Sequence, residues 1–226
     1  RSIKDINVEE KWVETQPGII LDELNNYLAP KGVLFAPDPS TSNRSNVGGA
    51  LGNNSCGAHS IMWGKTVDNV IEMDVILSDG TKTTFGQLDG AALESKMRSS
   101  SLEGDIYRNL FKIGEENRDL IIEKYPKIQR RVSGYNLDEF VNGKSFDMAR
   151  FVSGSEGTLV AITQAKLKVV SIPKLKCLAV LHCNDLAESM EATVASIEIH
   201  PAAVELIGSM ILRQAQSNLS YSRLTD

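Results

Sequence analysis

The stretch from residue 37 to residue 64, PDPSTSNRSNVGGALGNNSCGAHSIMWG, constrains the fold of this chain more than any other. It is rich in Gly, Ser and Asn, has few bulky apolar residues and shows no amphipathic periodicity. In a solvated linker this composition indicates a flexible coil. The flanking segments have the patterns of a buried strand and an amphipathic helix, however, so we expect an ordered loop inside a folded domain.

The residue types of this loop favour a large polar ligand. Glycine allows a positive φ angle or a close approach of the backbone to a ligand. The hydroxyl, amide and backbone N–H groups can donate hydrogen bonds. These properties suit a ligand that carries phosphates and a hydrogen-bonding ring.

A second loop of the same kind lies at residues 151–159, FVSGSEGTL, where Gly154 and Gly157 bracket a tight polar turn. An ordinary β-turn between core strands is the alternative interpretation. With the first loop present, we favour a turn that contacts the ligand. Glu156 would repel a phosphate, so we expect it to orient the backbone or a ribose through a hydrogen bond.

Five segments carry a resemblance to a known family. They are PDPST, NVGGALGNNSCG, WGKTVDNVIEMDVILSDG, RRVSGYNLDEF and ARFVSGSEGTLVAITQAKLKVV. The first three resemble the second part of the flavin-binding domain in the vanillyl-alcohol-oxidase-type family of FAD oxidoreductases, in the branch of D-lactate, glycolate and D-2-hydroxyglutarate dehydrogenases. The last two resemble the long members of that branch that also carry an iron–sulfur domain. Val160 departs from the pattern, because a Gly is common at its position.

The resemblance implies FAD as a non-covalent cofactor and oxidation of a 2-hydroxy acid, D-lactate-like or glycolate-like, to the 2-oxo acid. It also implies an electron acceptor or iron–sulfur domain elsewhere in the parent protein. The family's first Gly-rich flavin segment is not in this chain, so we expect an excised, catalytically inactive piece of a longer protein. The cofactor-binding residues that we predict are Pro37, Asp38, Ser40, Thr41, Asn46, Gly48, Gly49, Asn53, Asn54, Ser55, Gly57, His59, Gly154, Glu156, Gly157 and Ile162.

Several alternatives stay open at this point. The substrate could be a sugar lactone or an aromatic alcohol, and the piece itself could be a folded module without catalysis. Arg130 and Arg131 fit either a solvated face or the flavin side of the fold, and we assign no catalytic residue. We expect His59 to hydrogen-bond its loop, and Cys56 to be a small apolar group and not a flavin attachment point.

The composition of the chain limits the kinds of partner that it can bind and the compartment in which we expect it. The formal net charge is −5, which argues against nucleic acid and anionic membranes. No apolar run is long enough for a transmembrane helix, and the N-terminus lacks the apolar run of a signal peptide. The three cysteines form neither a disulfide framework nor a metal-ligand spacing. We therefore expect no metal and a cytoplasmic protein, with a peripheral membrane association of the parent left open.

The predicted fold class is α+β. We expect residues 1–173 to form the second part of an FAD-binding domain of the vanillyl-alcohol-oxidase type, and residues 174–226 the beginning of a ferredoxin-like cap domain. Residues 86–101 are expected to be irregular. Alternation predicts strands at 11–15, 70–77, 82–85, 160–169, 176–183 and 203–207. Apolar spacing of three to four predicts helices at 19–28, from 102 to a stop at Tyr125-Pro126, at 185–197 and from 209.

Overall fold

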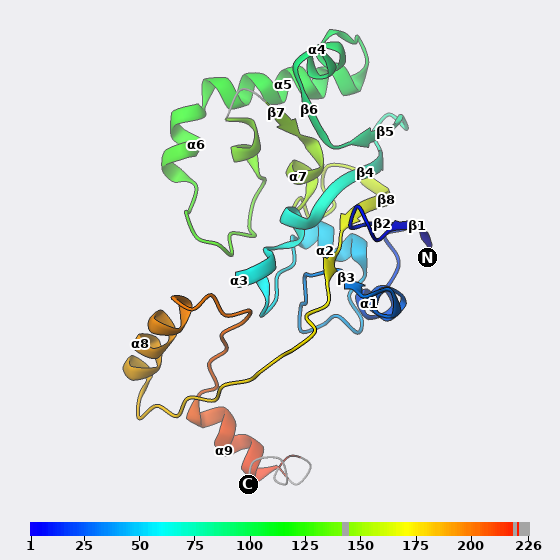
Figure 1. Cartoon of the computed structure of the whole chain (residues 1–226). Coiled ribbons are helices and arrows are strands. Elements are labelled where there is room, and N and C mark those ends of the chain that lie inside the picture. The colour runs from blue at the N-terminus through cyan, green and yellow to red at the C-terminus, as the bar shows by residue number, and fades with distance from the viewer. Residues whose placement is uncertain (142–144, 219–220, 222–226) are drawn as a thin grey trace. The chain divides into compact units, whose positions relative to one another are not determined.

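The computed structural model describes residues 1–141, 145–218 and 221. The chain divides into two units, Arg1–Pro173 and Lys174–Asp226 (Figure 1). Helices and strands are mixed in the first unit, so the predicted α+β class is confirmed. The assignment of each unit to a particular domain stays a prediction.

The first unit is built on a five-stranded antiparallel sheet whose strand order is β1-β2-β8-β4-β5. Strand β8 pairs with β2 on one side and with β4 on the other, which joins the two ends of the unit's sequence. The β4–β5 hairpin turns at Gly80, whose φ of +85° favours glycine. The strands are β1 Ile3–Asn7, β2 Trp12–Thr15, β4 Val70–Ile76, β5 Lys82–Phe85 and β8 Ala161–Lys168.

Smaller elements complete the unit. Two short antiparallel pairs, β3 with β9 and β6 with β7, lie outside the main sheet. Their bounds are β3 Val33–Leu34, β9 Val170–Ser171, β6 Gln87–Asp89 and β7 Ser145–Asp147. The helices are α1 Leu21–Leu28, α2 Val47–Asn53, α3 Ser60–Trp63, α4 Gly90–Arg98, α5 Leu102–Glu116, α6 Arg118–Lys124 and α7 Met148–Val152. Three short 3₁₀ helices are η1 Ala29–Lys31, η2 Thr66–Asn69 and η3 Leu137–Phe140.

The predicted helix at 19–28 is confirmed by α1, which buries three leucines completely because they recur at a spacing of three to four. The predicted strands at 11–15, 70–77, 82–85 and 160–169 are confirmed by β2, β4, β5 and β8. A single apolar core joins these elements. It includes Val13, Leu24, Met73, Phe85 and Leu167.

Two predictions for this unit were wrong, and a third, the long helix from residue 102, was wrong in part. The loop at 37–64 contains two short helices, α2 and α3, and the apolar residues Val47, Ala50 and Leu51 make one buried face of α2. Residues 86–101 are not irregular, since they contain β6 and α4. Helix α4 buries Leu93 and is tied to α5 by an ion pair of 2.6 Å between Lys96 and Glu103.

The long helix predicted from residue 102 is broken in two at Asn117, whose φ of −115° and ψ of 15° are not helical. The two resulting helices bury part of their apolar side chains, and Ile121 of α6 is 4% exposed. Tyr107, Leu110 and Gly114 are buried, whereas Leu120 is 54% exposed. Gly114 lets Phe140 approach, because a Cβ at residue 114 would lie 2.7 Å from the Phe140 carbonyl oxygen.

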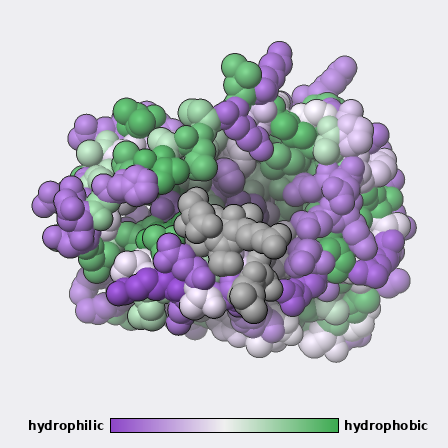
Figure 2. All heavy atoms as spheres, turned by 90° about the horizontal axis from the view of Figure 1, so that it is seen from below, coloured by the Kyte–Doolittle hydropathy of each residue, from purple (hydrophilic) through white to green (hydrophobic). Residues whose placement is uncertain are grey.

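In the second unit, the helices are α8 Leu186–Ile197 and α9 Ser209–Ser217, as predicted. Asp185 caps α8 by accepting a hydrogen bond from Glu188 N at 2.9 Å. The predicted strands at 176–183 and 203–207 are wrong, because no strand of the described residues pairs with either segment. Their apolar side chains are correspondingly exposed, Leu178 to 89%. Hydrophobic side chains also lie among hydrophilic ones on the surface shown in Figure 2.

Candidate cofactor site

The first loop is organised by the N-terminus of α2. The side chain of Asn46 caps this helix by accepting a hydrogen bond from Gly49 N at 2.6 Å. Gly48 N donates to the carbonyl of Pro17 at 2.8 Å, and a Cβ at residue 48 would lie only 2.8 Å from the Pro17 Cβ atom. Glycine at position 48 is therefore required by close packing of the chain against itself.

An open groove with a volume of about 390 Å³ lies along this loop. Most side chains in its wall carry a hydroxyl or an amide group, and Arg44 is the charged residue in it. Its lining residues are Pro39, Thr41, Arg44, Ser45, Asn46, Gly49, Asn53, Asn54, Ser55, Cys56 and Val132. The volume is within the range of about 300–1,000 Å³ that small-molecule sites occupy.

Asp38 and His59 form a second feature of the loop. Asp38 Oδ2 lies 2.5 Å from His59 Nδ1, and Oδ1 accepts a hydrogen bond from His59 N at 3.2 Å. The imidazole stacks on Trp63 with ring centroids 5.4 Å apart. This pair needs Gly57, because a Cβ there would lie 2.1 Å from the Asp38 carbonyl oxygen. His59 thus hydrogen-bonds its own loop.

The second loop docks onto the C-terminal end of α2. Gly154 N donates to Leu51 O at 2.8 Å, and Glu156 N donates to Gly52 O at 2.9 Å. These bonds satisfy carbonyl groups that the end of a helix leaves without intrahelical partners. The two loops, which the sequence predicts to serve one ligand, are thus in direct contact.

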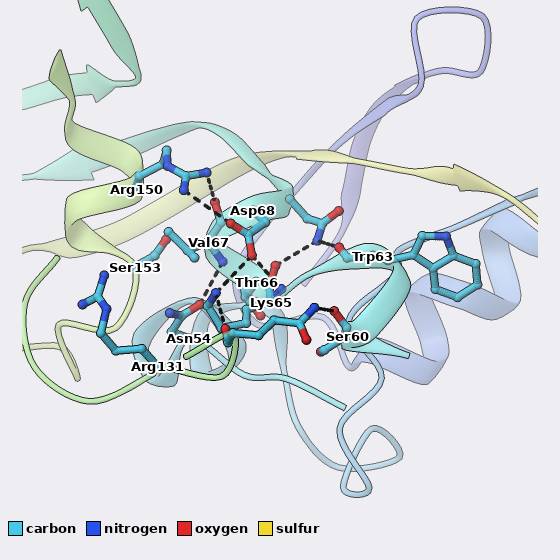
Figure 3. A network of polar contacts seen from close by, with 12 residues as sticks. Asn54, Ser60, Trp63, Lys65, Thr66, Val67, Asp68, Arg131, Arg150 and Ser153 are labelled. Carbon is cyan, nitrogen blue, oxygen red and sulfur yellow. Dashed lines mark hydrogen bonds and ion pairs between the residues drawn. The ribbon is translucent and has the colours of Figure 1, made fainter. Parts of the chain in front are cut away.

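Asn54 ends α2 and is buried at 1% exposure. Its φ of +49° is in the left-handed region, which asparagine tolerates better than most residues. Its Oδ1 atom accepts a hydrogen bond from Val67 N at 2.9 Å. Asn54 therefore connects α2 to the residues that lead into β4 (Figure 3).

Residues 126–136, which we call the strap, join the two loops through side chains. Gln129 Nε2 donates to the carbonyls of Ser60 at 2.9 Å and Ile61 at 3.2 Å. Arg130 donates to Gly57 O at 2.8 Å, and the Tyr135 hydroxyl lies 2.8 Å from the Thr158 hydroxyl. No backbone–backbone hydrogen bond joins the strap to either loop among the described residues.

The two arginines at 130 and 131 have different roles in the structure. Arg131 Nη2 donates to both carboxylate oxygens of Asp138, at 2.7 and 2.6 Å, and the guanidinium lies 4.7 Å from the Tyr125 ring centroid. This arginine therefore holds the strap to the residues on either side of it, Tyr125 and Asp138. Arg130 contacts the first loop and is exposed.

An ion-pair network is centred on Asp68 and Arg150, which are labelled in Figure 3. Asp68 accepts from Lys65 Nζ and Arg150 Nη2, each at 3.3 Å, and Arg150 Nε donates to Glu139 at 2.8 Å. Burial opposes ionisation of Asp68, but hydrogen bonds from Lys65 and the charges of Lys65 and Arg150 hold its pKa below the ordinary value. Burial raises the pKa of Glu139, although Arg150 opposes that rise. The network fixes η2 against α7 and η3.

The predicted cofactor residues divide into three groups. Those in the groove wall are Thr41, Asn46, Gly49, Asn53, Asn54 and Ser55. Those in the packing of the first loop beside it are Pro37, Asp38, Ser40, Gly48, Gly57 and His59. Those in or after the second loop are Gly154, Glu156, Gly157 and Ile162. Ile162 lies on β8 opposite Val75 and packs against the apolar core.

Sequence reasoning missed part of the groove wall. Pro39, Ser45 and Arg44 lie inside the predicted loop, and a cation among hydroxyl and amide groups was a usable signal for Arg44. Val132 comes from the strap, and no local pattern could place it beside residues 39–56. Cys56 is also in the wall, as a free thiol.

The groove residues fit a polar section of a dinucleotide. Gly49 lies in the wall, and Gly157 is open to solvent, since a Cβ at residue 157 would meet nothing within 4 Å. The wall offers hydrogen-bond donors and one cation, which is the donor set that phosphate and ribose groups use. Among the described residues, no group of three His, Cys, Asp or Glu side chains could hold a metal ion. No helix of the described residues is long and apolar enough to cross a membrane.

The chain is similar in sequence to several known proteins. A family described as FAD binding domain matches residues 1–86. D-2-hydroxyglutarate dehydrogenase of Escherichia coli (strain K12) is 33% identical over 226 residues, which are 99% of this chain and 22% of that protein. The mitochondrial D-lactate dehydrogenase [cytochrome] of Arabidopsis thaliana is 23% identical over 94% of this chain and 29% of that protein.

Among solved structures, an alkyldihydroxyacetonephosphate synthase matches 77% of this chain and 24% of its own, with a TM-score of 0.46 and 20% identity. The chain thus spans only about a quarter of the length of these relatives. The resemblance drawn from the sequence motifs, and FAD as the cofactor it implied, are confirmed.

Proposed function

We propose that this chain, which carries an FAD binding domain over residues 1–86 and is a homologue of D-2-hydroxyglutarate and D-lactate dehydrogenases, is part of an FAD-dependent oxidoreductase that converts a 2-hydroxy acid to the 2-oxo acid. The observation that carries the proposal is the groove along α2. All of its lining residues except Val132 lie within the segment that matches the FAD binding domain.

In this proposal the first and second loops hold the FAD molecule. Thr41, Asn46, Gly49, Asn53 and Ser55 contact it from the groove wall. Asp38, Gly48, Gly57, His59 and Gly154 act indirectly, since their contacts shape the loops and bring them together. Pro37, Ser40, Asn54, Glu156, Gly157 and Ile162 complete the set, with Asn54 as the buried anchor at the end of α2.

The bound flavin supplies the redox chemistry by accepting a hydride from the α-carbon of the acid. The residues of this chain position the cofactor and shield it. Recognition of the acid's carboxylate and removal of its hydroxyl proton belong to residues that we do not assign within this chain. We propose that residues 1–173 are the second part of the FAD-binding domain and that 174–226 begin the substrate domain, a division that coincides with the two units.

Two further parts of the proposal concern the parent protein. We infer that electrons leave the flavin for an iron–sulfur domain or another acceptor outside this chain. We also infer a reducing, cytoplasmic compartment, with membrane association at most peripheral. The reason is that Cys56, Cys177 and Cys183 are all free thiols.

The test is anaerobic mixing of the full-length flavoprotein with candidate substrates. The panel contains D-2-hydroxyglutarate, D-lactate and glycolate beside a sugar lactone and an aromatic alcohol. We expect a 2-hydroxy acid to bleach the visible absorbance of the flavin and the last two compounds to leave it unchanged. Bleaching by the lactone or the alcohol, with every hydroxy acid inert, would contradict the proposed reaction.

A further inference from the structure

The groove wall carries a positive charge, whereas the chain as a whole carries a net negative charge. The sequence has 29 acidic and 24 basic residues, so carboxylates are in excess overall. The groove wall nevertheless has no Asp or Glu among the described residues, and Arg44 is its one charged residue. This local positive charge favours an anionic ligand.

Arg44 is available to bind that ligand. Its side chain is exposed, and no ion pair or side-chain hydrogen bond engages it among the described residues. Its backbone N–H donates to Thr41 O at 2.9 Å, which fixes the position of the residue in the loop. By contrast, Arg131 in the strap and Arg150 in α7 are both paired with carboxylates.

The polar side chains around Arg44 also present donors. Asn46 uses its Oδ1 atom to cap α2, and its amide nitrogen makes no side-chain hydrogen bond among the described residues. The hydroxyls of Thr41 and Ser45 lie 2.6 Å apart, so one donates to the other and the second keeps its proton free. Ser55 Oγ accepts from Asn53 Nδ2 at 3.4 Å and can itself donate.

We propose that Arg44 binds a phosphate group of the dinucleotide, with the hydroxyls of Thr41 and Ser45 and the amide of Asn46 as further donors. This inference rests on the proposed function, and it adds the part of the cofactor that occupies the groove. The planar guanidinium can donate two parallel hydrogen bonds to two phosphate oxygens.

The side chains of the groove wall favour a phosphate over the flavin ring, because polar residues outnumber apolar ones and Arg44 can neutralise an anion. A site for a planar ring or for an acid lying against it is predominantly apolar. Here the apolar side chains of the wall are limited to Pro39, Cys56 and Val132. Hydroxyl and amide donors outnumber them, and Arg44 lies among those donors.

The experiment compares ligands that differ in their phosphates. The full-length apoprotein is titrated with FAD and with riboflavin, which has no phosphate, and flavin fluorescence reports binding. The variants are Arg44→Gln and the charge-conserving Arg44→Lys. Arg98→Gln is the matched control, because Arg98 lies on α4 and makes only an exposed ion pair of 2.8 Å with Glu94.

We expect Arg44→Gln to weaken FAD binding by about 10- to 100-fold, which corresponds to the loss of a hydrogen-bonded charge. Arg44→Lys should restore part of that loss, and Arg98→Gln should bind FAD like the natural protein. Riboflavin affinity should be the same for all four proteins. The FAD affinity of Arg44→Gln should also depend less steeply on salt concentration, since one ionic contact is gone.

Three results would overturn the assignment. One is unchanged FAD affinity and salt dependence in Arg44→Gln, and another is an equal loss for riboflavin. The third is unchanged FAD binding with a raised KM for the hydroxy acid, which would place the substrate carboxylate at Arg44. A natural protein that binds no FAD would instead contradict the proposed function itself.

Discussion

Replacing Gly57 by alanine tests how the first loop is held. A Cβ at this position would lie 2.1 Å from the carbonyl oxygen of Asp38 and 2.2 Å from its Oδ1 atom. The nearer of these is a backbone atom, so a rotamer change cannot relieve the clash. The backbone of one loop segment must move away from the other.

The loss in the free energy of unfolding can be estimated from the contacts that this movement breaks. Forcing an extra methyl group into a packed site costs typically about 1–3 kcal/mol. The movement also strains the bond of Asp38 to His59 and that of Arg130 to Gly57 O, each worth about 1 kcal/mol net. We therefore expect Gly57→Ala to lower the free energy of unfolding by roughly 3–5 kcal/mol.

The measurement is urea-induced unfolding of the protein without added flavin, with thermal unfolding as a second probe. The matched control is Gly18→Ala, because a Cβ at residue 18 would meet its nearest atom, Arg1 Cγ, at an ordinary 3.7 Å. The control should change stability by less than about 1 kcal/mol, and in the stabilising direction. A Gly57→Ala protein within about 0.5 kcal/mol of the natural one would refute the reasoning.

Three further predictions follow from the site. Gly49→Val in the full-length protein should abolish flavin retention, because Gly49 lines the groove, whereas Gly52→Ala in the same helix should retain the visible flavin absorbance, since its Cβ meets no atom closer than 3.9 Å; equal flavin content in both variants would contradict this. Gln129→Leu should speed tryptic cleavage after Arg130 and Arg131, because the strap loses two hydrogen bonds to the first loop, while Ile128→Ala, a strap residue that is 64% exposed, should be cleaved at the natural rate; identical rates would argue that Gln129 does not hold the strap. The lowered pKa of Asp68 contributes stability above the unfolded value near 3.8, and that contribution is lost as the pH falls through the folded pKa, so Asp68→Asn should be less stable than the natural protein at about pH 6, and the difference should shrink as the pH falls below the unfolded value; a constant difference in urea midpoint would show that Asp68 does not titrate as described.

The sequence predicted the sheet well because its strands have strong local signals. The hairpin of β4 and β5 combines buried apolar residues with the turn at Ser78-Asp79-Gly80, and both are read from neighbouring residues. The helix α1 was predictable for the same reason, since its three buried leucines fix its period. In the second unit the alternation of apolar residues led to a wrong prediction. Alternation in residues 176–183 shows that the segment could form a strand, but not whether a neighbouring strand is present to pair with it.

The sequence predicted which segment forms the candidate site, but not which residues within it contact one another. A loop rich in glycine indicated close approach of the backbone, and the structure shows that the close partner differs from one glycine to the next. At Gly48 it is Pro17, at Gly57 it is Asp38, and Gly49 alone of these lines the groove. The chemistry of glycine is the same at each position, so only the tertiary contact separates a glycine needed for folding from one that leaves space for a ligand. The strap was not predictable either, because Gln129 and Val132 show no pattern that is typical of a ligand site. Gln129 nevertheless holds the first loop, about 70 residues away in sequence, and Val132 lines the groove.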